Sequence, residues 1–116
     1  MGNPICHFEI GCRDLARSSE FYSKLFDWQI NQQQSAGWIR TGEDIGGHLK
    51  QLRDDQRNYV AVYIAVDDVQ ASLDKAVALG GKALLPVTNI LSGQCSWIAD
   101  PDGNVIGLFK ETPDTA

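Results

Sequence analysis

The sequence predicts an α+β fold of two tandem βαβββ modules, and three observations support this prediction. First, the chain repeats itself: a shift of 54 residues places Asp14 on Asp68. Second, residues 5–12 alternate with a period of two, as a half-buried strand does. Third, each of the two aspartates is followed by apolar residues at helical spacing. An internal repeat of this length is typical of a domain built from two similar supersecondary units.

Composition limits the size and class of the protein. The chain has 116 residues and a net charge of −5, which predicts one domain over residues 1–116 and no basic surface for nucleic acid or anionic membrane. No apolar run approaches the ~20 residues needed to cross a bilayer, and no secretory signal is expected at the amino terminus. Three cysteines without a Cys-x-x-Cys pair indicate a reduced, cytoplasmic protein.

Module one is expected at about residues 5–52. Its first strand places Phe8 and Ile10 on one face, and His7 and Glu9 on the other. Asp14 is suited to cap a helix, because its carboxylate can accept from first-turn N–H groups. The remaining expected elements are a helix at 15–26, strands at 28–34, 37–41 and 45–52, and turns at Ala36-Gly37 and 42–44.

Module two is expected at about residues 59–111, after a polar break at 54–58. The first strand is expected to direct Val60, Val62, Ile64 and Val66 to the core and Tyr59, Ala61, Tyr63 and Ala65 to the other side. Asp68 should cap a helix whose apolar stripe is Val69, Leu73, Ala76 and Leu79, and Gly80-Gly81 should end it. The remaining expected elements are strands at 82–87, 94–100 and 104–110, a turn at 101–104 and a frayed tail at 111–116.

Several motifs together resemble the vicinal oxygen chelate superfamily, which includes glyoxalase I, bleomycin-resistance proteins and extradiol dioxygenases. The resemblance covers about residues 5–111, and some of it is to a bacterial glyoxalase-like subgroup of unassigned chemistry. It implies that the curved mixed sheets of the two modules form a cup for a small molecule. The motifs are His7–Ile10, Asp14-Leu15, Glu20–Tyr22, Leu25–Trp28, Ile45–Gly47, Val66–Val69, Leu79–Lys82, Asp100–Asn104 and Gly107–Phe109.

The resemblance also implies where a metal would be bound, on the first and fourth strands of each module. His7 matches the first-module position, whereas Ala61 and Gly107 in the second module cannot supply a ligand. The fourth strand of the first module offers Gly47, or His48 if the register is shifted by one. No metal cofactor is therefore expected. The alternative is a divalent ion on His7, Glu9 and His48, in a metal-dependent glyoxalase-like lyase or dioxygenase.

The remaining candidates suggest a binding site for a flat organic molecule. Aromatic walls with a few polar groups suit such a ligand, although each tryptophan could instead fill the core or a subunit interface. No catalytic residue is assigned, but a metal-independent enzyme with Glu9 or His7 as base stays open. The expected pocket residues are His7, Glu9, Trp38, His48, Tyr59, Tyr63 and Trp97.

Other conspicuous residues have simpler explanations. Asp14 and Asp68 are expected to be helix caps, and Asp102 a turn residue. Arg40, Lys50 and Arg53 could contact an acidic ligand or be solvated charges at strand edges. A homodimer is expected, because open sheet edges are a liability unless they are covered.

Overall fold

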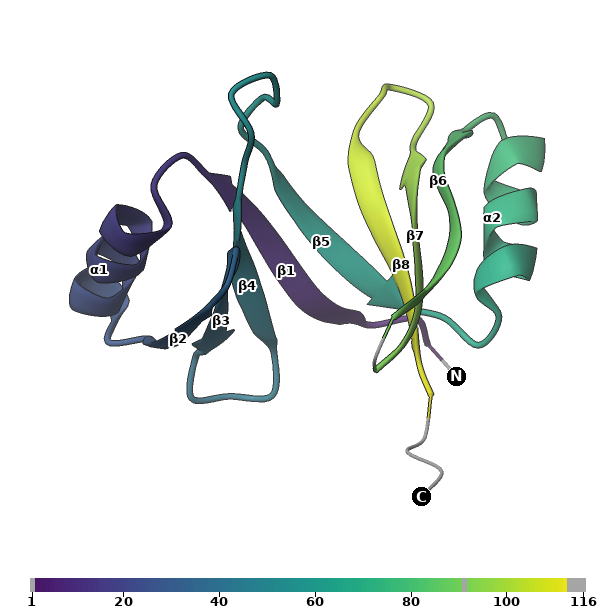
Figure 1. Ribbon diagram of the computed structural model, residues 1–116. Coiled ribbons are helices and arrows are strands. Elements are labelled where there is room, and N and C mark those ends of the chain that lie inside the picture. The colour runs from purple at the N-terminus through teal and green to yellow at the C-terminus, as the bar shows by residue number, and fades with distance from the viewer. Residues whose placement is uncertain (1, 91, 113–116) are drawn as a thin grey trace. The chain divides into compact units, whose positions relative to one another are not determined.

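The computed structural model describes residues 2–90 and 92–112 (Figure 1). Contacts within the chain divide it into two compact units. The first module is Cys6–Val62, and the second module is Tyr63–Ala116 together with Met1–Ile5.

Both modules have the same topology, which confirms the predicted α+β fold. The first contains the strand order β2-β3-β4-β1 and the second the order β6-β7-β8-β5. In each, the first and fourth strands are parallel and the other pairs are antiparallel. The elements are β1 Ile5–Cys12, α1 Leu15–Phe26, β2 Gln29–Gln33, β3 Ala36–Arg40, β4 Gly46–Gln51, β5 Val60–Ala65, α2 Val69–Ala78, β6 Lys82–Ile90, β7 Gly93–Ala99 and β8 Val105–Glu111.

The two helices begin at the predicted caps. Asp14 accepts a hydrogen bond from the backbone N–H of Arg17, and Asp68 accepts one from that of Ala71. Each carboxylate thus satisfies a first-turn donor that has no partner inside the helix. Past the end of α2, Gly80 takes the predicted left-handed conformation with φ of +102°.

One face of each sheet packs against its helix. In the first module this leaves the opposite face of β1, which carries His7 and Glu9, directed away from α1. The buried core residues of the first module are Cys12, Leu15, Ile39 and Leu49, with Phe8, Ile10, Tyr22, Trp28 and Ile30 packed against them. Those of the second are Val69, Leu73 and Leu108, with Val66, Val87 and Ile98.

Three local predictions are wrong. Ala36-Gly37 is not a turn but the start of β3, and the hairpin instead turns at the preceding two residues, where Gln34 has a φ of 53°. Val60 is 68% exposed because it is the first residue of its strand. Leu79 is 72% exposed because it follows the last helical residue.

The loops fit the predictions more closely. Gly103 in the predicted 101–104 turn has a φ of 94°, and Asp100 accepts from the backbone N–H groups of Asp102 and Asn104. Residues 113–116 of the predicted tail lie outside the described residues. None of the helices in the described parts of the chain is long and apolar enough to span a membrane.

Candidate functional site

Strand pairing in the first module brings four of the predicted site residues onto one sheet face. Glu9 on β1 is the direct partner of His48 on β4, which is in turn the partner of Trp38 on β3. His7 lies two residues before Glu9 on β1, so its side chain is on the same face. This face, opposite α1, is referred to below as the open face.

His48 lies between Glu9 and His7 on the open face. Its Nε2 lies 3.2 Å from Glu9 Oε1, and its Nδ1 lies 2.8 Å from His7 Nε2. Glu9 is only 4% exposed. Each ring nitrogen of His48 therefore has a polar neighbour, a hydrogen-bonded imidazole at Nδ1 and a carboxylate oxygen at Nε2.

Tyr59 binds the second oxygen of the Glu9 carboxylate. Its hydroxyl donates to Glu9 Oε2, and its carbonyl accepts from the backbone N–H of Gly11 at 2.9 Å. A Cβ at Gly11 would lie 3.0 Å from the Tyr59 ring. Glycine at this position therefore leaves room for the tyrosine ring to reach Glu9.

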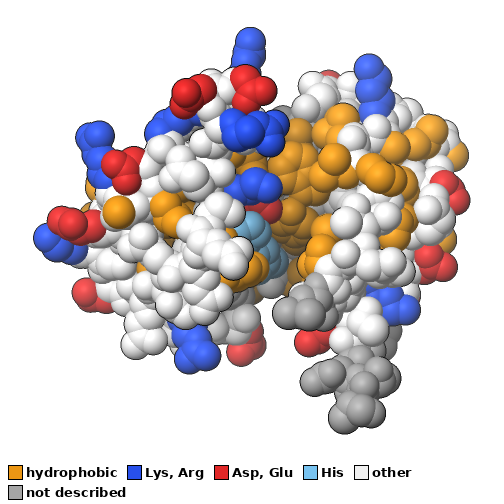
Figure 2. Space-filling view, viewed as in Figure 1, with side chains coloured by type: hydrophobic (Ala, Val, Ile, Leu, Met, Phe, Trp, Pro, Cys, Tyr) orange, Lys and Arg blue, Asp and Glu red, His pale blue; other side chains and the backbone are white. Residues whose placement is uncertain are grey.

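Trp38 forms the exposed part of the site. Its ring centroid lies 4.9 Å from that of His48 and 6.4 Å from that of His7, yet the residue is 47% exposed. Histidine atoms are also visible at the surface in Figure 2. The open face thus presents an exposed indole beside a pair of hydrogen-bonded imidazoles.

The environment of His7 keeps it neutral. Burial, and then the neighbouring His48, lowers the pKa of His7 from its ordinary value of 6.5 to about 4, while Glu9 acts in the opposite direction. At neutral pH the imidazole is therefore uncharged and able to accept a proton.

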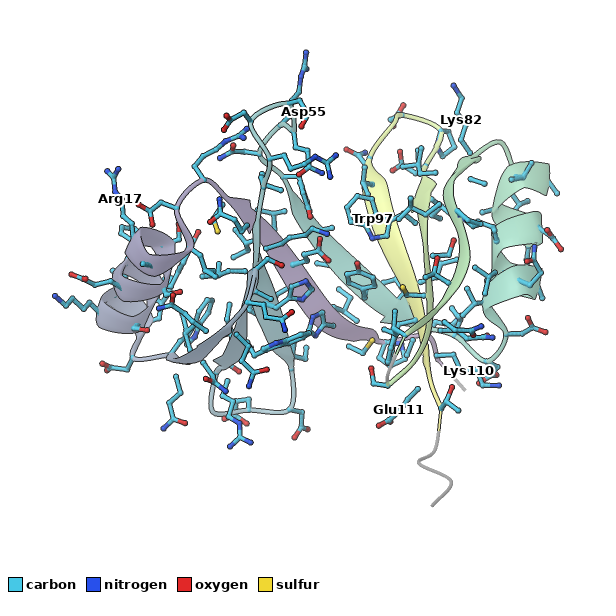
Figure 3. All side chains as sticks on the ribbon, in the orientation of Figure 1. Arg17, Asp55, Lys82, Trp97, Lys110 and Glu111 are labelled. Atoms are coloured by element: carbon cyan, nitrogen blue, oxygen red, sulfur yellow. The ribbon has the colours of Figure 1, made fainter. Side chains whose placement is uncertain are left out.

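The other two predicted site residues lie in the second module and contact each other. Trp97, labelled in Figure 3, donates from Nε1 to the hydroxyl of Tyr63 at 2.7 Å. Gly107 is the direct partner of both residues, and a Cβ there would lie 2.3 Å from the Tyr63 ring. The Tyr63 ring therefore fills the space that a side chain at position 107 would need.

The pairing of β4 with β1 also determines which residue of β4 lies on the same sheet face as His7. Gly47 is paired with Phe8, and a Cβ on it would lie 2.7 Å from the Phe8 ring, on the helix-packed face. Of the two alternatives on β4, Gly47 therefore lies on the helix-packed face, whereas His48 shares the face of His7 and Glu9. A one-residue change of register places a side chain on the opposite face of a sheet.

The donor set does not fit the metal that the family resemblance implies. His7 and His48 share a hydrogen bond, and the second nitrogen of His48 faces Glu9. Ala61 has no donor atom, and Gly107 could not become glutamate without displacing Tyr63. Within residues 2–90 and 92–112, no group of three His, Cys, Asp or Glu residues is arranged to hold a metal ion.

Sequence comparison identifies relatives over most of the chain. A model of the glyoxalase-like domain family matches residues 7–109. CFP32 of Mycobacterium tuberculosis, provisionally named a glyoxylase, is 30% identical over an alignment of 108 positions that covers 84% of this chain and 41% of that protein. The anthracycline biosynthesis protein DnrV of Streptomyces peucetius is 25% identical over an alignment of 125 positions that covers 90% of this chain and 46% of that protein. The chain thus spans less than half the length of these relatives.

Solved structures with the same fold are more distant in sequence. Methylmalonyl-CoA epimerase from Mycobacterium tuberculosis superposes with a TM-score of 0.74 at 14% identity, over 94% of this chain and 88% of that one. The hypothetical protein BH1468 from Bacillus halodurans superposes with a TM-score of 0.75 at 12% identity, over 100% and 99%. At such low identities the likeness establishes the fold alone.

Proposed function

Because the chain belongs to the glyoxalase-like domain family, we propose that it binds a small, partly aromatic organic molecule on the open face of its first module, without a metal ion. The observation that carries this proposal is the exposed Trp38 ring beside His48. A large aromatic side chain left half in water offers a planar ligand a surface on which to stack.

The tryptophan lies against a rigid neighbour. A hydrogen bond between Nδ1 and His7 and a 3.2 Å contact between Nε2 and Glu9 hold the His48 ring, and Trp38 contacts that ring. A ligand that stacks on Trp38 therefore meets a surface that needs little ordering, which reduces the entropic cost of binding.

Charge on the open face favours a ligand with an anionic group. Arg40 is two residues from Trp38 on β3, and Lys50 is two residues from His48 on β4, so both belong to this face. Of all the residues of β1–β4, which the structure describes in full, Glu9 is the only acid, and its carboxylate is engaged by His48 and Tyr59. The solvent-exposed charges of this face are therefore cationic.

One relative supports an aromatic ligand. DnrV is named for anthracycline biosynthesis, and anthracyclines are fused-ring aromatic compounds. This chain covers 46% of that protein, so the relative supports only the class of ligand.

Calorimetric titration with anthraquinone-2-sulfonate, a planar aromatic anion, tests the proposal. We expect saturable binding that weakens at least tenfold in Trp38→Ala, because the stacking surface is lost (about 1.4 kcal/mol). The matched control is Phe21→Ala, which removes another exposed aromatic ring, 59% exposed, from α1. Absence of binding by the unmodified protein, or equal weakening in both variants, would contradict the proposal.

A further inference from the structure

We propose that Asn31 on β2, with the amide side chains on either side of it, forms a neutral hydrogen-bonding subsite beside Trp38. This subsite selects aromatic ligands that have a hydroxyl or carbonyl oxygen on the ring. The inference rests on the proposed function, because the ring must stack on Trp38 before the amides can reach its substituents.

Strand pairing places a row of amides along the open face. Strand β2 lies at the edge of the first module's sheet and pairs with β3 in antiparallel register. Asn31 is the direct partner of Trp38, and the Cβ atoms of such partners lie roughly 5 Å apart on the same face. Gln29 and Gln33 are two residues away on either side, so they share that face. All three amide side chains are exposed.

The other residues of β2 confirm which face has the amides. Ile30 packs against the core of the first module. Gln32 is two residues further along and pairs with Gly37, where a Cβ would lie 3.3 Å from the Leu15 side chain on α1. Alternate residues of a strand point to opposite faces. Ile30 and Gln32 therefore lie on the helix side of the sheet, and Asn31 lies on the open face.

Amide side chains suit an uncharged oxygen substituent on the ligand. Each amide has two N–H donors and a carbonyl acceptor. It can therefore donate to a ring carbonyl, and it can either donate to a hydroxyl or accept from one. No residue of β2, from Gln29 to Gln33, is charged, so these hydrogen bonds should depend little on salt.

The second module has no amide at the equivalent position. There the strand that corresponds to β2 is β6, and the partner of Trp97 is Leu85, which is 44% exposed. The pairing of β6 with β7 also shifts on both sides of Leu85, whereas the pairing of β2 with β3 is unbroken from Gln29 to Gln33. A tryptophan with a regular row of amides beside it is thus a feature of the module that has the proposed ligand face.

A cation at one end of the amide row completes the arrangement. Gln29 is the direct partner of Arg40, which is two residues from Trp38 on β3. A planar ligand on Trp38 would therefore meet amides along β2 and a guanidinium group toward the end of β3. These neighbours define the class of ligand as a hydroxy- or keto-substituted aromatic acid.

Calorimetric titration with two naphthalene compounds tests the inference. 6-Hydroxynaphthalene-2-sulfonate differs from naphthalene-2-sulfonate by one hydroxyl, which is uncharged at neutral pH. We expect the hydroxylated compound to bind about fivefold more tightly, which corresponds to one net hydrogen bond of about 1 kcal/mol. The ratio of the two affinities should be the same at low and high salt, because the amides are neutral.

Two leucine variants of β2 show whether the amide causes this preference. Asn31→Leu keeps nearly the same shape and gives Trp38 an apolar partner, as Trp97 has in Leu85. The affinity ratio should fall to about one in this variant, because the hydrogen bond is lost. The matched control is Gln32→Leu, which removes an exposed amide from the helix side of the same strand. Here the ratio should stay at about fivefold.

The possible outcomes separate this inference from the binding proposal. Equal affinity of the unmodified protein for the two compounds, or an equal fall of the ratio in both variants, would overturn the subsite. Absence of binding by both naphthalene compounds would also overturn it. If anthraquinone-2-sulfonate still binds through Trp38 in any of these cases, the ligand face stands without the amide subsite. If anthraquinone-2-sulfonate does not bind either, both proposals fail.

Discussion

The two modules share one arrangement of strands but use it differently. In the first, Glu9, His48 and Trp38 are consecutive partners across the first, fourth and third strands. In the second, the same positions are occupied by Tyr63, Gly107 and Trp97. Backbone pairing thus fixes three equivalent positions in each module, and the side chains placed there decide what each module can do.

Both modules have a tryptophan at the equivalent position, but its surroundings differ. Trp38 contacts the His48 ring and is half exposed, whereas Trp97 donates a hydrogen bond to the buried Tyr63. Where the first module has a histidine, the second has a glycine that admits a tyrosine ring. We infer that the polar chemistry lies in the first module and that the aromatic pair of the second is mainly packing.

The largest expected effect comes from restoring a family-type ligand in the second module. Gly107→Glu would place a Cβ 2.3 Å from the Tyr63 ring, and overpacking of this kind costs about 3 kcal/mol of unfolding free energy. Urea denaturation measures the loss. The control is Gly2→Glu, where a Cβ meets nothing within 4 Å.

A double-mutant cycle identifies the cause of that loss. If the Tyr63 ring is the obstacle, Gly107→Glu should cost less than about 1 kcal/mol in a Tyr63→Ala background. An equal cost in both backgrounds would show that the ring does not block position 107, and the contrast between the modules would then lose its main structural support.

The next prediction compares two residues at equivalent positions, Glu9 and Tyr63. Glu9→Gln replaces the carboxyl group that accepts from Tyr59 and lies 3.2 Å from His48 Nε2, which should lower the unfolding free energy by about 2 kcal/mol. Tyr63→Phe removes the acceptor of the Trp97 N–H and should cost about 1 kcal/mol. Equal losses in urea denaturation would indicate that polar contacts stabilise the first module no more than they stabilise the second.

Stability should also depend on pH through the first module. The pKa of His7 is lowered to about 4 in the folded protein from an ordinary 6.5, so the unfolded chain binds a proton more readily between these values. The stability contribution of neutral His7 is therefore complete above pH 6.5 and is lost as the pH falls toward 4. Because the ring is partly exposed, we expect a loss of about 1 kcal/mol after solvent screening.

Thermal denaturation between pH 4 and pH 7 measures this loss, with His7→Ala as the comparison. The variant has alanine at position 7, as the second module has at Ala61, and it should lose stability less steeply over this range. An unchanged slope would assign the acid sensitivity to other groups, and the lowered pKa of His7 would be wrong.

Local patterns in the sequence predicted the scaffold well, because they depend on neighbours along the chain. The alternation of residues 5–12 and the caps at Asp14 and Asp68 are both found in the structure. The choice between Gly47 and His48 could not be made in this way, since it depends on the pairing of β4 with β1.

The contacts that complete the site were missed for a similar reason. The Tyr59–Glu9 hydrogen bond joins residues 50 positions apart, and its only local signal is the missing side chain at Gly11. Likewise, the sequence alone indicates a missing metal ligand at Gly107. In the structure, the absence of a side chain there leaves room for the Tyr63 ring. A glycine in a strand can thus mark the position over which a side chain from a distant part of the sequence packs.

The smallest expected effect concerns the charges that flank the first-module site. By register, Arg40 and Lys50 correspond to Ala99 and Phe109 in the second module, so only the first offers cations beside its tryptophan. Arg40→Gln should weaken the binding of anthraquinone-2-sulfonate by about threefold at low salt and by less at high salt, because a solvated charge pair is screened. Calorimetry at two ionic strengths measures this, with Lys24→Gln on α1 as the control. Equal affinity in all three proteins would mean that the ligand face selects by aromatic stacking alone, and the contrast between the modules would then reduce to Glu9, His48 and His7.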